Sequence, residues 1–188
     1  MTAIMERRVR WLCVGLLAVI LGLAPGHVDV ARGEDAPAPP QGAGSRAEEA
    51  RLLKEQGDEY ESQDRHAEAI VAYRAAIAAD PSLVPEVEPS LGASLLWADR
   101  TEEAVKVLSS AAARNPDDLE TRKLLALGYR WSDRLDEAER LYRENLREQP
   151  EDAEERTGLA IALQWQGKER EAVAEFRRVL EARTDEEE

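Results

Sequence analysis

Cysteine and histidine are scarce in this 188-residue sequence, which contains one cysteine and two histidines. Cys13 alone cannot form an intrachain disulfide, and His27 and His66 are too far apart in the sequence to suggest a metal-ligand pair. The sequence also shows no glycine-rich phosphate loop and no Ser/His/Asp set. We therefore predict a protein that is not an enzyme and that uses no cofactor and no metal.

Positive charge is also in short supply. There are 25 basic and 39 acidic side chains, and the formal net charge is −14 at pH 7. A protein that binds DNA or RNA neutralises phosphates with clustered lysine and arginine, so this balance argues against a nucleic-acid partner. Glutamates and aspartates on acidic helices most often form a solvated face, and they do not by themselves indicate a catalytic pair.

Residues 1–26 have the pattern of an export signal. A basic start, formed by Arg7, Arg8 and Arg10, precedes an apolar run over 11–24. The run has about fourteen residues, which is short for a membrane span. Ala24 and Gly26 put small residues where a signal peptidase requires them, and a cut after Gly33 also fits. We expect export to the periplasm or cell envelope; the alternative is a retained membrane anchor, the one case in which a membrane is a partner.

Residues 27–49 are rich in alanine, proline and glycine, with alternating Ala and Pro from Ala36 onward. Such a composition favours an extended chain that cannot cover a core. We therefore predict a disordered linker, which tethers the following domain.

A period of 34 residues dominates the rest of the chain. It relates Ala104, Ala138 and Ala172, and it also relates Trp97, Trp131 and Trp165. Ala69 lies 35 residues before Ala104, so one residue is inserted between the first two units. A fixed period of this length is the mark of a repeat architecture, in which each unit buries its apolar face against its neighbours.

Each unit contains apolar residues at helical spacing, a short polar turn, a second helical pattern and, in three of the units, a proline. The residues at the interlocking positions are Leu53, Gly57, Tyr60, Ala69, Tyr73, Ala76 and Pro81 in the first unit; Leu91, Gly92, Leu95, Ala104, Leu108, Ala111 and Pro116 in the second; Leu125, Ala126, Tyr129, Ala138, Tyr142 and Pro150 in the third; and Leu159, Ala160, Leu163, Ala172 and Phe176 in the fourth. This pattern resembles the tetratricopeptide repeat, a helix-turn-helix unit of the same length.

The resemblance implies an all-α fold, an α-solenoid of four helix pairs over 50–186, with repeats at 50–83, 85–118, 119–152 and 153–186. The prolines at Pro81, Pro85 and Pro89 surround the insertion. Because proline is accepted only in the first turn of a helix, we expect the third helix to begin near Glu88 and to be about one turn short.

The three repeated tryptophans point to a candidate binding surface. At 100° per residue, Trp131 lies opposite the stripe formed by Leu125, Ala126 and Tyr129, and it shares its own stripe with Leu127 and Arg130. The resemblance implies that this stripe lines the groove where partners bind. The predicted groove residues are Trp97, Trp131, Trp165, Leu96, Leu127, Arg130, Ile161 and Gln164. With helices about 8–10 Å apart, the indoles would form a row at that pitch. The alternative is that each tryptophan packs across a repeat junction and contributes only to the fold.

These features predict a non-catalytic exported scaffold that binds a protein partner through the groove. A second hypothesis is a structural, self-assembling protein of the cell envelope, in which apolar residues of the last helix, Val173, Val179 and Leu180, pair with another copy. The sequence segments around Trp131 and Trp165 also resemble repeats of envelope proteins that assist polysaccharide export. An accessory role in such a system is therefore a further alternative.

Overall fold

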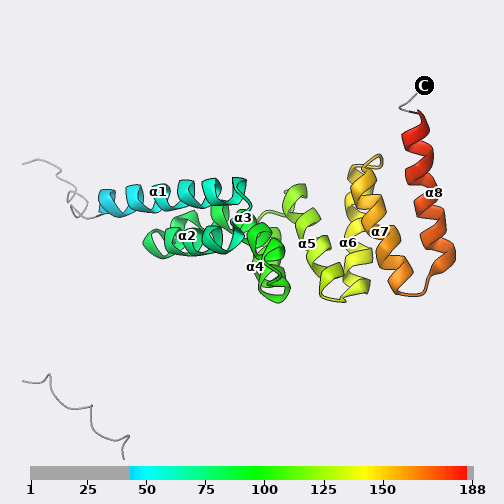
Figure 1. Ribbon diagram of the computed structural model, residues 1–188, viewed down its shortest axis with the longest axis horizontal. Coiled ribbons are helices and arrows are strands. Elements are labelled where there is room, and N and C mark those ends of the chain that lie inside the picture. Colours follow the sequence, from blue (N-terminus) through cyan, green and yellow to red (C-terminus); the bar gives the residue numbers. More distant parts are fainter. Residues whose placement is uncertain (1–42, 186–188) are drawn as a thin grey trace, which may run out of the picture. The chain divides into compact units, whose positions relative to one another are not determined.

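The computed structural model describes residues 43–185, which form eight α-helices and one short 3₁₀ turn (Figure 1). The elements are α1 (Ala43–Ser62), α2 (His66–Ala79), η1 (Pro81–Leu83), α3 (Val84–Trp97), α4 (Thr101–Arg114), α5 (Leu119–Trp131), α6 (Leu135–Glu148), α7 (Ala153–Trp165) and α8 (Glu169–Asp185). This part of the chain contains no strand, so the predicted all-α class is confirmed. The predicted signal segment and most of the linker lie outside the described residues. No helix within 43–185 is long and apolar enough to cross a membrane.

The helices form four successive antiparallel pairs, α1–α2, α3–α4, α5–α6 and α7–α8, and each helix packs chiefly on the one before it and the one after it. Within a pair, the turn contains one residue with a positive φ. These residues are Asp64, Asp99, Asp133 and Gly167, with φ between 57° and 76°. Their spacing repeats the period of the sequence, so each repeat uses the same turn geometry.

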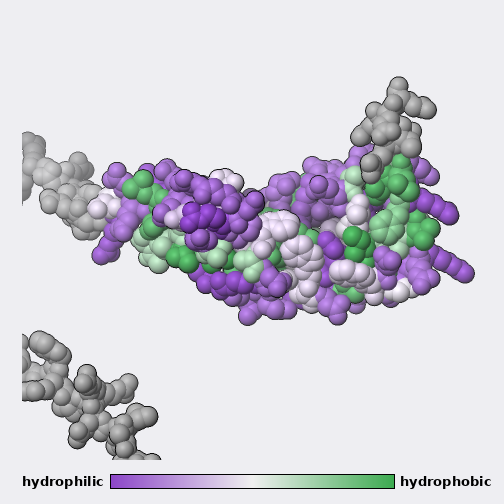
Figure 2. All heavy atoms as spheres, viewed as in Figure 1, coloured by the Kyte–Doolittle hydropathy of each residue, from purple (hydrophilic) through white to green (hydrophobic). Residues whose placement is uncertain are grey.

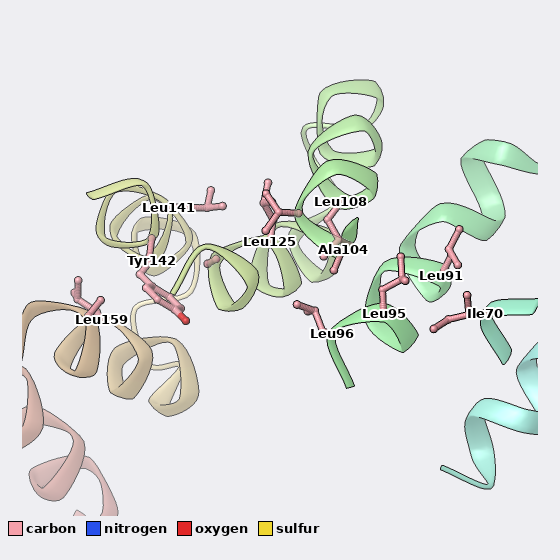
Figure 3. Packing of buried hydrophobic residues seen from close by; sticks show 14 of the residues in the cluster. Ile70, Leu91, Leu95, Leu96, Ala104, Leu108, Leu125, Leu141, Tyr142 and Leu159 are labelled. Atoms are coloured by element: carbon pink, nitrogen blue, oxygen red, sulfur yellow. The ribbon is translucent and has the colours of Figure 1, made fainter. Parts of the chain in front are cut away.

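One continuous core runs through the array (Figure 3). Ile70 of α2 faces Leu91 and Leu95 of α3, and Leu125 of α5 lies beside Leu108 of α4. Close helix contacts need small residues: a Cβ added at Gly57 would lie 2.5 Å from the ring of Tyr73. The junctions before α5 and α7 are capped by aspartates. The Asp152 side chain accepts hydrogen bonds from the backbone N–H groups of Glu154 and Glu155, at 3.0 and 2.9 Å.

Two predicted boundaries are wrong. The helix α1 begins at Ala43, inside the segment expected to be linker. The helix α3 begins at Val84 and has 14 residues, as α2 and α4 do, so it is not shortened. The inserted residue is absorbed in η1, where the Asp80 side chain accepts a hydrogen bond from the Ser82 N–H. Pro89 lies inside α3, where it removes one backbone hydrogen bond near the helix start without ending the helix.

Candidate partner-binding cleft

A cleft of about 570 Å³ opens along the first helices of the later repeats. Its walls come mainly from α5 and α7, with one residue each from α3, α6 and α8. The lining residues are Trp97, Glu120, Lys123, Leu124, Leu127, Arg130, Tyr142, Ala153, Glu154, Glu155, Thr157, Gly158, Ile161 and Val179. Gly158 allows α7 to pack closely on α6, because a Cβ at that position would lie 2.6 Å from the Tyr142 ring.

The structure brings four of the predicted groove residues to this cleft: Trp97, Leu127, Arg130 and Ile161. Trp131, Gln164 and Trp165 are exposed on the same helices but do not line it. The three indoles are accessible, with 54% of Trp97, 38% of Trp131 and 54% of Trp165 exposed. They are therefore not sealed between helices.

Leu96 does not belong to the groove, and its prediction as a groove residue is wrong. It occupies the same repeat position as Arg130 and Gln164, but its side chain is fully buried. A Cβ added at Gly128 of α5 would lie 3.3 Å from Leu96, which shows that the following repeat covers this leucine. An apolar side chain at this position turns toward the next helix, whereas the polar side chains of Arg130 and Gln164 remain at the surface or the cleft.

The predicted even row of indoles is also wrong. The rings of Trp97 and Trp131 touch edge to face, with centroids 5.4 Å apart and an interplanar angle of 74°. Trp165 is contacted instead by the guanidinium of Arg130, which lies 5.7 Å from the ring centroid. Arg130 also donates from Nε to the Tyr142 hydroxyl at 3.2 Å. The three indoles are therefore not evenly spaced as the helix spacing alone predicted. Two of them contact each other, and the third contacts Arg130.

The acidic end of the cleft is only partly neutralised. Lys123 Nζ lies 2.7 Å from Asp152 and 3.2 Å from Glu120, and the hydrogen bond to Asp152 raises the pKa of the lysine. Burial acts to raise the pKa of Asp152, but Lys123 and the capped N–H groups hold it below its usual value. Glu154 and Glu155 add two more carboxyl groups to the same lining.

Glu155 is the buried member of this group. Burial raises its pKa to about 7, against the effect of the Asn145 side chain, which donates from Nδ2 to Glu155 Oε2 at 2.8 Å. The other polar side-chain atom of Asn145, Oδ1, is buried and has no hydrogen-bond partner among residues 43–185. Near neutral pH the cleft therefore holds a carboxyl group that is divided between its charged and neutral forms.

The sequence contained a signal for this pair that the groove prediction did not use. Glu155 occupies the repeat position of Val87 and Thr121, both of which are buried, and Asn145 occupies the position of Ala76 and Ala111. Two polar residues at positions that are apolar or small elsewhere predict a buried polar contact once the repeats are aligned. Glu120 and Glu154 carried no such signal, because acidic residues in a first helical turn are ordinary helix-start features.

Within residues 43–185 no group of three or more histidine, cysteine, aspartate or glutamate side chains could hold a metal ion. The lining combines aliphatic and aromatic side chains with a few charged groups, the usual composition of a binding site.

Four stacked helix pairs with this interlocking pattern define a tetratricopeptide-type α-solenoid, and solved structures of that type are similar to this chain. MamA 41-end from Desulfovibrio magneticus RS-1 has a TM-score of 0.69 and 19% identity, covering 74% of this chain and 78% of that chain. Another crystal structure of MamA has a TM-score of 0.65 and 22% identity, covering 73% and 80%. YrrB, described as a TPR protein with an unusual peptide-binding site, has a TM-score of 0.69 and 19% identity, covering 75% and 71%.

No protein-family model matches the sequence. No curated protein matches it either. The structural similarity establishes the tetratricopeptide-repeat fold, as the sequence predicted.

Proposed function

We propose that this protein is a non-catalytic scaffold that binds an extended segment of a protein partner in the cleft along α5 and α7. The observation that carries the proposal is the cleft itself, in which the exposed indole of Trp97 stands beside the aliphatic side chains of Leu127 and Ile161. An exposed tryptophan next to an apolar cleft is a common binding hot spot, because a partner can bury it at little conformational cost.

The charge of the cleft favours a partner segment with basic side chains. Lys123 is already paired with Asp152, and Arg130 is engaged with Trp165 and Tyr142. Glu154 is exposed and carries no ion pair within the described part of the chain, and the net charge of the whole protein is −14. A lysine or arginine next to an apolar residue would complement this surface, whereas nucleic acid or an acidic segment would be repelled.

The place of action that we propose is the periplasm or cell envelope. The support is the pattern of residues 1–26 and the proline-rich segment after it. Mass spectrometry of the N-terminus of the protein expressed with its full leader tests this proposal. A new N-terminus after Gly26 or Gly33 would support export with cleavage. An intact N-terminus in the membrane fraction would support the anchor, and an intact N-terminus in the soluble fraction would contradict both.

The cleft is tested with a library of extended peptides that vary in charge and in apolar side chains, with tryptophan fluorescence as the readout. We expect peptides with an apolar residue flanked by lysine or arginine to be selected. Replacement of Trp97 by alanine should weaken their binding by about 2 kcal/mol or more, because the indole forms one wall of the cleft.

The matched control is Val71→Ala, which removes an exposed apolar side chain from α2, away from the cleft lining. It should leave peptide binding unchanged. A second cleft variant, Ile161→Ser, should weaken the binding of the same peptides whose binding Trp97→Ala weakens. Selection of acidic peptides, or equal binding by the wild type and both cleft variants with their helical content intact, would exclude the cleft as the binding site.

A further inference from the structure

The last helix of the array, α8, leaves open a face that the preceding repeats cover. The residue position shared by Ile70, Val105, Glu139 and Val173 shows this directly. Ile70 and Val105 are 1% and 3% exposed because the next helix pair lies over them, and Glu139 is also buried. Val173, the equivalent residue of α8, is 48% exposed. In Figure 2 hydrophobic surface is visible over α8 among hydrophilic side chains.

A second repeat position also is more exposed in α8 than in the preceding repeats. Ile77, Ala112 and Leu146 are partly buried against the core, whereas their equivalent in α8, Leu180, is 62% exposed. The two open residues lie seven positions apart, on one stripe of α8. The stripe therefore has the spacing and the apolar character of a surface that normally receives the first helix of a following repeat.

A charged position on the same face indicates which side chain a helix pair docked on α8 would carry. Arg74 pairs with Glu103 of the next repeat at 2.5 Å, and Arg143 pairs with Glu171 of the next repeat at 2.8 Å. Arg177 is the equivalent residue of α8, and within residues 43–185 it forms no ion pair. A glutamate in the first turn of a docked second helix would stand opposite this arginine.

The helix that covers α8 must also have a small residue at one position. The position of a first helix that meets the preceding repeat is occupied by Ser94, Gly128 and Ala162, all buried. Gly128 shows the reason, because a Cβ there would lie 3.1 Å from Val105. A larger residue would hold the two helices apart.

These requirements disfavour two ways of covering α8 with a second copy of this chain. The helix α1 carries Glu59 at the position where the other first helices are small, so it would place a carboxylate against Val173. Pairing of α8 with itself would match Val173 to Leu180 of the other copy and bring Arg177 of both copies together near the two-fold axis. Like charges at that point disfavour the pair.

We propose that the α8 face, formed by Val173, Arg177 and Leu180, docks a helical hairpin of another protein that continues the array. The hairpin has a small residue on its first helix, opposite Val173, and a glutamate at the start of its second helix, opposite Arg177. This surface is separate from the cleft, so the two can be occupied and tested independently.

The probe is a fluorescein-labelled peptide of residues 118–149, which spans the helix pair α5–α6 and contains Gly128 and Glu137 at the two required positions. It is titrated with the full chain by fluorescence anisotropy. We expect saturable binding that becomes at least about tenfold weaker with Val173→Glu and with Leu180→Glu, since each exposed side chain is buried in the complex. Arg177→Glu should also weaken binding, and a Glu137→Arg peptide should restore it with that variant.

Two control variants locate the binding site. Leu52→Glu changes an exposed leucine on α1, at the other end of the array, and Trp97→Ala changes the cleft; neither should alter binding of the hairpin peptide. Absence of saturable binding, loss of binding with Trp97→Ala, or failure of the charge swap would overturn the proposal. A dimer of the chain in light scattering that Val173→Glu converts to a monomer would assign the face to a second copy instead, and would also overturn it.

Discussion

At the scale of single residues, two buried glutamates show how the array tolerates charge in opposite ways. Burial acts to raise the pKa of Glu139, but Lys168 at 2.6 Å and Arg143 outweigh it and hold the pKa below its usual value. Glu155 forms no ion pair in the part of the chain that the structure describes, and its direct partner is the neutral side chain of Asn145. Its pKa is therefore raised to about 7. The ionised carboxylate is therefore favoured in the folded protein at Glu139 and disfavoured at Glu155, so the two side chains make stability depend on pH in opposite directions.

Replacement of Glu155 by glutamine should stabilise the protein at pH 8 and have little effect at pH 5. Between pH 4.5 and 7 the folded protein binds a proton at Glu155 that the unfolded chain has lost, so the stability of the wild type falls as the pH rises through this window. Glutamine does not titrate, and its amide can also donate to the unpaired Oδ1 of Asn145. We expect a gain on the order of 2 kcal/mol at pH 8 in urea unfolding.

Glu139→Gln is the matched control, because its pKa is shifted in the other direction. Its carboxylate contributes stability above its unfolded pKa of 4.5, and this contribution is lost as the pH falls through the lower folded pKa. The variant should therefore be destabilised at pH 7, and the difference from the wild type should shrink toward pH 3. If both variants changed stability in the same direction at pH 7–8, the contrast between the two sites would be refuted.

The sequence predicted the side of its helix on which a residue lies, because the helical and repeat periods determine it. The helical period placed Trp97, Leu127, Arg130 and Ile161 on one stripe, and the structure places all four at the cleft. The same period could not separate Leu96 from Arg130, because it gives the direction of a side chain from its own helix and not the helix that will cover it. The contact between Trp97 and Trp131 is likewise a matter of side-chain packing, which repeat spacing does not determine.

At the scale of the element, the helix-turn-helix unit depends on one backbone conformation. Asp64, Asp99 and Asp133 all have φ near +58°, where most side chains are strained, and Gly167 takes the same place in the last repeat with φ +76°. The sequence predicted these turns from their polar residues. It did not predict where α3 begins. The proline-rich start suggested a short helix, but η1 takes up the inserted residue and leaves the full helix length intact.

Two substitutions at this turn position should have opposite effects on stability. Asp133→Gly removes a Cβ from the left-handed region and should stabilise the protein by about 0.5 kcal/mol. Gly167→Val introduces a β-branched side chain at φ +76° and should destabilise it by about 1–2 kcal/mol. Urea midpoints of both variants, compared with Gly44→Ala on the exposed start of α1, provide the measurement. A loss of stability in Asp133→Gly would show that the aspartate side chain has a role beyond the turn.

At the scale of the whole array, stability is shared between neighbours, since each helix packs chiefly on the helices before and after it in the chain. Residues in the middle of the array are covered by a repeat on each side. The last helix packs mainly on α7, and its outer stripe with Val173 and Leu180 is exposed. In such an architecture the free energy needed to unfold a helix locally is expected to be lower toward an uncovered end.

Hydrogen exchange should therefore be graded along the chain. We expect backbone amides of α8 to exchange faster than those of α4, α5 and α6, because opening α8 breaks the interface with one neighbour and opening a central helix breaks two. Mass spectrometry of peptic fragments at several exchange times measures this gradient. Addition of the hairpin peptide of residues 118–149 should slow exchange in α8 of the wild type, because it supplies the second neighbour, and should leave the Val173→Glu variant unchanged. Equal protection across all the helices would mean that the array opens only as one cooperative unit, and α8 would then be no weaker than the centre.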